Sequence, residues 1–246
     1  MVRLMDHVGN KTQMDKRIRE IDNRLVYKSD RETLVIEPWG RDGLRVRVTP
    51  LPEIIDRPWA LTEPVDAQAT IEISDAEATI RNGNLSARIR DIYTQNGHVE
   101  FFKHTEDQMI PILSEYDYGV HAHNPGTRRF KSVDEGLFES ELHFAARDGE
   151  RFYGMGENAT GRLDLKGCVI DLYQRHVKAV VPFVVSSEGY GFLWNNPSLG
   201  RAEFGNNMTR WVSYGSKQMD YYVTAGDSYA DVMENYADVT GHAPEF

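Results

Sequence analysis

The sequence predicts an all-β protein, an antiparallel β-sandwich with one short helix near its C-terminal end. Short runs of alternating or clustered β-branched residues recur from residue 24 to residue 223, turn-forming residues separate them, and a helical apolar stripe occurs only after residue 227. Many strands at short intervals with almost no helix between them are typical of antiparallel sandwiches. We therefore expect an N-terminal tail or short helix over residues 1–22, a β-sandwich over 23–226, and a helix with a linker over 227–246.

The first half of the expected sandwich contains strand patterns at residues 24–27, 33–37, 44–48, 78–80 and 85–89. In the run 44–48, Leu-Arg-Val-Arg-Val, strict alternation predicts one buried face and one solvent-exposed face. Residues 50–66 carry four spaced prolines, which excludes an interior strand because proline donates no ladder hydrogen bond. Asn82-Gly83-Asn84 predicts a hairpin with a type I′ turn, since this turn needs residues that tolerate positive φ.

The second half continues the strand series at residues 138–145, 169–172, 177–185, 191–194 and 219–223. The stretch VPFVVSSEGYGFLWNNPSLG, residues 181–200, fits two paired strands joined by a hairpin over 186–190. Near the end, Tyr229, Val232, Met233 and Tyr236 are spaced i, i+3, i+4 and i+7, as on one stripe of a helix. Asp227 or Ser228 is expected to cap this helix, and Gly241 to end it in the left-handed conformation.

Composition excludes several classes of function. The formal net charge of -10 argues against nucleic acid, which needs a basic face. No apolar run approaches the roughly 20 residues that span a bilayer, and residues 1–20 lack the apolar region of a signal peptide, so we expect no membrane contact. Cys168 is the only cysteine, so an internal disulfide is ruled out and a cytoplasmic location is favoured. A single cysteine in an apolar run is usually a small core residue.

The sequence contains only weak signals for metals, cofactors or nucleophiles, so we expect no cofactor and no metal. Gly154-Met155-Gly156-Glu157 lacks a following P-loop lysine, which favours a bend between strands over a phosphate site. His121 and His123 share one side of an extended segment, but no third metal ligand is evident and a solvated loop is the simpler interpretation.

Two groups of residues have the chemistry of sugar enzymes or sugar binding. Paired carboxylates are typical of glycoside hydrolysis, and the candidate groups are Glu115 with Asp117, and Glu157 with Asp164 and Asp171. Because the chain has 38 acidic residues, most of these carboxylates are expected to be surface charges on sheet edges. Trp194-Asn195-Asn196 and the segment 206–211, which ends at Trp211, supply rings and amides for a sugar. Core packing and a turn are the alternative interpretation.

An ordered series of short segments resembles the N-terminal β-sandwich of family 31 glycoside hydrolases, the group of α-glucosidases and α-xylosidases. The segments are FYGMGE at 152–157, GRLDLKG at 161–167, VPF at 181–183 with 186–193, DYY at 220–222, GDS at 226–228, and YADVTG at 236–241. The resemblance implies a galactose-mutarotase-like supersandwich. It also implies that a (β/α)8 barrel, absent from this chain, carries both catalytic aspartates of a retaining enzyme, so no catalytic residue is expected here. The domain would pack on its own barrel, line part of the pocket for an α-linked oligosaccharide or glycoside, and be inactive alone.

The same resemblance implies substrate-binding roles for Gln174, Arg175 and His176. In the family this segment leads into a loop over the barrel mouth, where an Asn or Arg and then an Asp contact the leaving-group sugar. Gln174 and Arg175 occupy the first of those places, and His176 stands where the Asp is often found, which predicts an altered substrate preference. A solvated strand end is the alternative for the segment. For the whole chain, the alternative is a stand-alone carbohydrate-binding or aldose-mutarotase-like protein using His121, His123 and Glu157 as acid and base.

Overall fold

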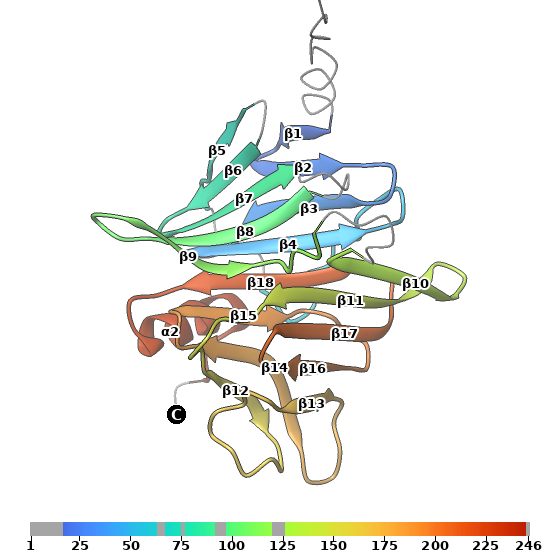
Figure 1. The fold of residues 1–246 in the computed structure, drawn as a ribbon, viewed down its shortest axis with the longest axis vertical. Coiled ribbons are helices and arrows are strands. Elements are labelled where there is room, and N and C mark those ends of the chain that lie inside the picture. Colours follow the sequence, from blue (N-terminus) through green and yellow to red (C-terminus); the bar gives the residue numbers. More distant parts are fainter. Residues whose placement is uncertain (1–16, 63–66, 75–76, 92–96, 120–125, 245–246) are drawn as a thin grey trace, which may run out of the picture.

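The fold consists of two layers of antiparallel β-sheet (Figure 1) in a computed structural model that describes residues 17–62, 67–74, 77–91, 97–119 and 126–244. One layer is an eight-stranded sheet in the order β1 (Ile18–Ile21), β2 (Arg24–Lys28), β3 (Thr33–Pro38), β4 (Gly43–Thr49), β18 (Met219–Ala225), β15 (Tyr190–Trp194), β14 (Ala179–Ser186) and β12 (Phe152–Glu157). This layer joins strands from both halves of the chain through the pairing of β4 with β18.

The other layer contains two five-stranded sheets. One has the order β10 (Arg128–Asp134), β11 (Leu137–Ala145), β17 (Met208–Ser216), β16 (Gly200–Phe204) and β13 (Val169–Leu172). The other runs β5 (Thr70–Ile73), β6 (Glu77–Asn82), β7 (Leu85–Asp91), β8 (Gly97–His104) and β9 (Met109–Ser114). An isolated bridge between Glu115 and Phe144 links the two sheets where β9 meets β11. The predicted all-β antiparallel sandwich is confirmed.

Aromatic side chains fill the space between the layers. The Phe192 ring lies 4.7 Å from Trp211, 5.4 Å from Phe144 and 5.3 Å from Tyr221, measured between centroids, and all four side chains are buried. Offset and edge-on ring pairs of this kind add to the free energy gained by burying apolar area. The core therefore continues from the eight-stranded sheet into the sheet that carries β11 and β17.

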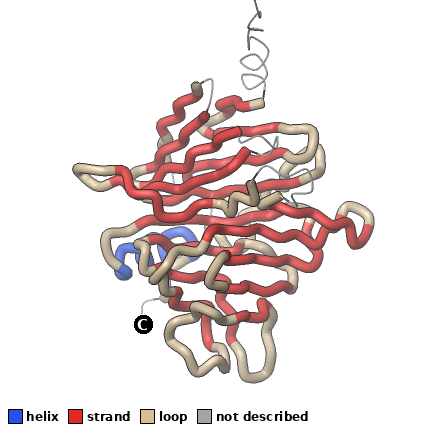
Figure 2. The backbone as a smooth tube through the Cα atoms, in the orientation of Figure 1, coloured by secondary structure: helices blue, strands red, loops and turns tan. Residues whose placement is uncertain are grey.

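The outer face of the eight-stranded sheet is covered by the helix α2 (Tyr229–Thr240), which is blue in Figure 2, and by the proline-spaced segment 50–62. Phe183 of β14 stacks on Tyr236 of the helix with ring centroids 3.9 Å apart. The Asn195 side chain accepts from the Ala60 amide at 3.1 Å and donates to the Pro58 carbonyl at 3.0 Å, which ties the segment to the sheet. Within the described residues, no helix has both the length and the apolar character needed to cross a membrane.

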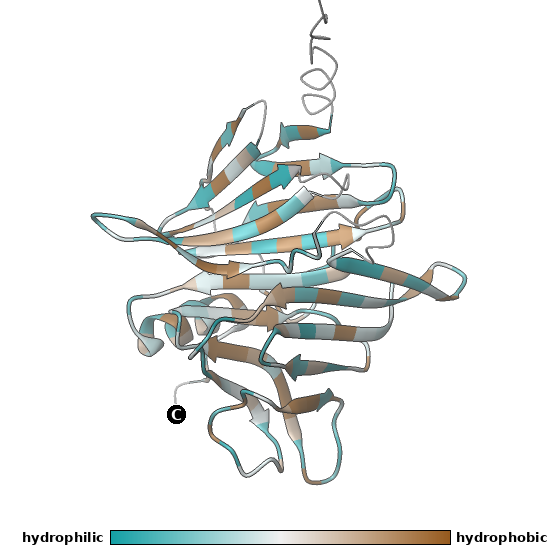
Figure 3. Ribbon diagram, viewed as in Figure 1, coloured by the Kyte–Doolittle hydropathy of each residue, from teal (hydrophilic) through white to brown (hydrophobic). Residues whose placement is uncertain are grey.

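The solvent-exposed face predicted for β4 is wrong, because all seven residues of the strand are buried. Figure 3 shows hydrophilic and hydrophobic residues alternating along β4. The side chains of Arg45 and Arg47 donate to the backbone carbonyls of Arg57 and Ile55, so segment 50–62 covers the hydrophilic side. Arg45 pairs with Asp220 at 2.6 Å, and Arg47 pairs with Glu37 at 2.6 Å and with Asp56 at 2.8 Å. Burial raises the pKa of the Asp220 carboxyl, and the hydrogen bond and charge of Arg45 act in the opposite direction.

Two turns differ from the sequence interpretation. The hairpin at Asn82-Gly83-Asn84 is confirmed, but only Gly83 has a positive φ, +57°, which fits a type II′ turn with glycine first and not the predicted type I′. Asp22 and Asn23 have φ of +50° and +60° and join β1 to β2. Residues 18–21, expected in the tail or a short helix, are therefore a strand, because this turn returns the chain along β2.

The C-terminal helix is confirmed, but it is rotated relative to the predicted stripe. Tyr229 and Met233 are exposed, whereas the buried residues are Val232, Asn235 and Val239. The rotation follows from Asn235, a polar residue whose amide donates to the Thr224 hydroxyl and the Ala225 carbonyl, each at 3.0 Å. Ser228 is the N-cap and forms a capping box with Asp231. Gly241 ends the helix with φ +103° and ψ +137°, outside the predicted left-handed helical region.

Candidate functional site

Two loops project from the same end of the sandwich, the lower end in Figure 1. The loop 158–168 connects β12 to β13, and the loop 173–178 connects β13 to β14. β12 is an edge strand of the eight-stranded sheet and β13 is an edge strand of a five-stranded sheet, so both connections cross between the layers. Gln174, Arg175 and His176 lie in the second loop, and all three are exposed.

The loop 173–178 is held in shape by its own contacts. The side-chain amide of Gln174 donates to the backbone carbonyl of Val180 at 2.9 Å and accepts from the backbone N–H of Val180 at 3.0 Å. It thus forms the pair of hydrogen bonds that a neighbouring strand would form. Arg175 and Lys178 form a bridge, in which the Lys178 amide donates to the Arg175 carbonyl at 3.0 Å. These contacts leave His176 and Val177 at the tip of a tight turn.

The polar groups of this loop are unequally available. Both functional atoms of the Gln174 amide are engaged within the loop, so Gln174 positions its neighbours. The Arg175 guanidinium lies 4.3 Å from the centre of the Tyr173 ring, which supports it through a cation–π contact. The His176 side chain makes no hydrogen bond or ion pair with the described part of the chain. Arg175 and His176 are thus the groups of the predicted set that are available to a ligand.

The neighbouring loop 158–168 is fixed by Asp164 and Leu165. The Asp164 carboxylate accepts from the backbone amides of Phe152 at 3.2 Å and Lys166 at 3.0 Å, and Leu165 is buried in the core. Leu163 points to solvent with 82% of its surface exposed, and Val177 of the other loop is 70% exposed. Asp164, one of the carboxylates considered for catalysis, therefore has a structural role in this arrangement.

The sequence suggested a bend between strands at Gly154-Met155-Gly156. The structure instead places this segment within β12. The register with β14 shifts between Gly154 and Gly156, which marks a bulge. A Cβ at Gly156 would lie 2.0 Å from the Ala179 carbonyl oxygen, and its φ is +74°, so only glycine fits. The bulge also turns the buried Met155 side chain into the core with φ +67°.

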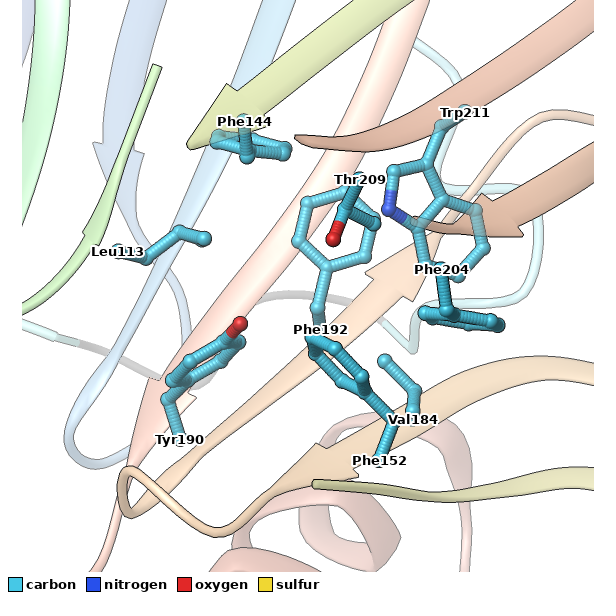
Figure 4. A pocket seen from close by; sticks show the side chains of 9 residues that line it. All are labelled: Leu113, Phe144, Phe152, Val184, Tyr190, Phe192, Phe204, Thr209 and Trp211. Carbon is cyan, nitrogen blue, oxygen red and sulfur yellow. The ribbon is translucent and has the colours of Figure 1, made fainter. Parts of the chain in front are cut away.

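The tryptophans considered for sugar stacking are core residues. Trp194 and Trp211 are each 1% exposed and lie 6.1 Å apart between ring centroids. Figure 4 shows Trp211 among nine side chains around a void of about 10 Å³ between the layers. That size is the lower bound for one water, and the lining is almost entirely apolar, so the void is a packing feature.

The other considered residues are dispersed. Glu115 is buried and pairs with Arg128 at 2.5 Å, which corrects the expectation of a surface charge. Asp117 and Glu157 are exposed, Asp171 and Cys168 are half-buried, and His121 and His123 lie outside the described residues. No group of three His, Cys, Asp or Glu side chains suited to a metal ion occurs in the described ranges.

Sequence reasoning missed a groove of about 400 Å³ on the outer face of the sheet β5 to β9. Its lining comes from all five strands, and no strand pattern was identified in three of them, β5, β8 and β9. Alternation of Glu, Thr and Arg with apolar residues along β6 and β7 was the available signal.

Comparison with known proteins places the chain in a defined group. Residues 33–201 match the family described as glycosyl hydrolase 31 N-terminal galactose mutarotase-like domain. The chain is 41% identical to the uncharacterized family 31 glucosidase ORF2 of Pseudescherichia vulneris, over 91% of this chain and 45% of that protein. It is 28% identical to alpha-xylosidase A of Aspergillus niger, over 87% of this chain and 31% of that protein.

Solved structures give the same result. The GH31 α-xylosidase from a soil metagenome, complexed with xylose, superposes with a TM-score of 0.83 and 34% identity, over 92% of this chain and 35% of that one. The chain therefore spans less than half the length of the relatives that it matches.

Proposed function

We propose that this chain, which belongs to the glycosyl hydrolase 31 N-terminal galactose mutarotase-like domain family, is the non-catalytic N-terminal domain of a retaining α-glycosidase. The observation that carries the proposal is the coverage: 91% of the chain aligns with a family 31 glucosidase and accounts for only 45% of it. Two further relatives are named α-xylosidases, so the proposed substrates are α-glucosides or α-xylosides.

The proposed chemistry lies in a (β/α)8 barrel that follows this domain in the whole enzyme. One barrel aspartate attacks the anomeric carbon, a second protonates the leaving oxygen, and water completes a double displacement with retention. A barrel of this kind needs roughly 250 residues. The direct test is NMR of the first product formed from 4-nitrophenyl α-xyloside or α-glucoside by the protein extended through its downstream coding sequence. The α-anomer supports the proposal, and the β-anomer contradicts it.

The domain itself would pack on the barrel and form one wall of the substrate pocket. The two loops at one end of the sandwich support this role, because each exposes an apolar side chain, Leu163 or Val177, next to polar groups. We expect both side chains to be covered when the domain packs on the barrel.

Within that wall, Arg175 and His176 would contact the leaving-group sugar while Gln174 holds the loop. A neutral imidazole donates one hydrogen bond and accepts another, whereas a guanidinium only donates. Losing one such bond costs about 1 kcal/mol, which corresponds to roughly a fivefold rise in KM. In the extended protein, His176→Ala is therefore expected to raise the KM for an α-linked substrate that has a leaving-group sugar, with little change in kcat. The exposed Lys131→Ala on β10 is the control, and equal KM values for the two variants would refute the contact.

The contacts of Arg175 and His176 would make the domain bind carbohydrate directly. We further propose a cytoplasmic location. The single cysteine, Cys168, supports this location because no disulfide framework is needed. Fractionation of the native host tests it: enzyme activity recovered from the culture medium or an extracytoplasmic fraction would contradict the location.

A further inference from the structure

Side chains on the outer face of the sheet β5 to β9 form two rows that run across the strands. Strand pairing aligns Thr70, Arg81, Ser86 and Phe102 in one row, and Glu72, Thr79, Arg88 and Glu100 in the other. Neighbouring strands repeat about every 4.8 Å, so each row offers one side chain per step across the sheet. The opposite face of the same strands carries the apolar residues of the core.

All residues of these rows except Glu100 line the groove of about 400 Å³, a volume within the usual range for small-molecule sites, roughly 300–1,000 Å³. The lining residues are Thr70, Glu72, Glu77, Thr79, Arg81, Ser86, Arg88, Phe102, His104 and Met109. The groove thus combines hydroxyl, carboxylate, guanidinium and imidazole groups with one aromatic and one thioether side chain.

The floor of the groove is fixed by Phe102 and Arg88. Phe102 faces away from the core yet is only 5% exposed, because the Arg88 guanidinium lies 4.5 Å from its ring centre. Arg88 is held in turn by Glu100 at 3.0 Å. Arg90 also pairs with Glu100, so one carboxylate orients two guanidinium groups. A platform fixed in this way loses little side-chain entropy when a ligand binds.

The lining carries no net formal charge, since Glu72 and Glu77 balance Arg81 and Arg88. His104 contacts the Ser86 hydroxyl at 2.8 Å, and burial together with the Arg81 charge lowers the pKa of its imidazole. His104 is therefore neutral near pH 7, and both it and Ser86 are able to donate and to accept hydrogen bonds. An anionic ligand would find the Arg88 guanidinium already engaged by carboxylates.

We propose that this groove binds a neutral oligosaccharide, at a second carbohydrate site separate from the loop 173–178. A saccharide matches the lining because it presents hydroxyls that donate and accept, together with C–H faces that pack on apolar and planar groups. The rows across the strands favour a chain of several sugar units over a single unit. Met109, which is 50% exposed on β9 at the rim, supplies the apolar contact at one end.

The test is isothermal titration calorimetry of the 246-residue chain with maltohexaose and with xylohexaose. The expected result is saturable binding of at least one of them. Met109→Glu is expected to weaken the association constant about fivefold, because half of a methionine side chain loses its apolar contact. Arg81→Gln is expected to weaken it as well. The matched control is Met233→Glu on α2, a methionine that is 47% exposed and should leave binding unchanged.

Several results would overturn the proposal. Absence of saturable binding for both saccharides would do so, as would an equal loss in Met109→Glu and Met233→Glu. If Met109→Glu instead dissociates a dimer in sedimentation and leaves saccharide binding intact, the groove is an interface between copies of this chain. If His176→Ala abolishes binding while Met109→Glu does not, the loop 173–178 is the binding site. That outcome leaves the proposed function intact and removes only the second site.

Discussion

Replacing Arg128 by methionine should destabilise the fold more than almost any other single change. Its guanidinium is fully buried and donates to Glu32 at 2.6 Å, to Glu115 at 2.5 Å and to the Gly97 carbonyl at 2.6 Å. These partners come from the β2–β3 connection, the end of β9 and the start of β8, so Arg128 of β10 joins both layers. Burial acts to lower the pKa of Arg128, but attraction from Glu115 and Glu32 outweighs it and raises that pKa.

The expected cost follows from what the substitution leaves behind. Removing one partner of a buried ion pair typically costs about 3–5 kcal/mol, because the remaining charge has neither solvent nor a counter-ion. Arg128→Met leaves two carboxylates, Glu32 and Glu115, which are 5% and 1% exposed. The free energy of unfolding should therefore fall by at least about 3 kcal/mol. Since domains are stable by only about 5–15 kcal/mol, the variant should remain folded but lose much of its stability.

Urea unfolding followed by tryptophan fluorescence measures this loss, with the adjacent Arg129→Met as control. The Arg129 side chain is 33% exposed, and it contacts Glu141 at 3.5 Å, the Tyr118 hydroxyl at 3.1 Å and the Gly126 carbonyl at 3.3 Å. Because solvent weakens contacts of a partly exposed group, its replacement should cost only about 1 kcal/mol. Adding Glu32→Gln and Glu115→Gln to Arg128→Met removes the uncompensated charges and should recover part of the stability. The reasoning fails if the two arginine variants lie within 1 kcal/mol of each other, or if the added glutamines lower stability further.

Two smaller perturbations test the local geometry. Hydrogen bonds from the Ser228 side chain and backbone lower the pKa of the Asp231 carboxyl below its usual 3.8, so its stabilising effect is present above pH 3.8 and is lost as pH falls through the lowered value. The Tm difference between wild type and Asp231→Asn should therefore shrink as the pH falls below 3.8, and a difference independent of pH would contradict this. Gly156→Ala should cost about 3 kcal/mol or more because its Cβ would meet a carbonyl oxygen, whereas Gly161→Ala, also at positive φ but with open space around it, should cost about 1 kcal/mol; equal costs in denaturant unfolding would refute the steric argument.

Local signals in the sequence predicted the elements whose stabilising contacts are also local. The hairpin between β14 and β15 was predicted because an apolar run, two serines and two glycines occupy one continuous stretch. Its connection is shorter than the expected 186–190, because Ser186 and Tyr190 already pair. The start of α2 was predicted in the same way, since its cap depends on Ser228 and Asp231, three residues apart.

Contacts between residues far apart in the sequence explain the main errors in the predicted exposure of charged residues. Arg45 and Arg47 follow the pattern of an exposed strand face, yet segment 50–62 and Asp220, 175 residues from Arg45, bury and neutralise them. Glu115 was interpreted as a surface charge for the same reason, because nothing near it in the sequence indicates that Arg128 will pair with it in the core. A single sequence shows which residues are charged but not which charges meet.

The candidate site was located by resemblance and not by pattern. Gln174, Arg175 and His176 follow an unremarkable strand, and their roles toward a sugar stay a prediction. The structure adds that Gln174 is engaged by Val180, a contact that periodicity could not indicate. The groove on β5 to β9 lacked even a resemblance, since its residues become neighbours only through strand pairing.

The most direct measurement is hydrolysis of 4-nitrophenyl α-glucoside and α-xyloside by the 246-residue chain and, in parallel, by the protein extended through its downstream coding sequence. We expect turnover by the extended protein and none by the 246-residue chain. Turnover by the 246-residue chain alone would contradict it, because catalysis would then lie within this β-sandwich.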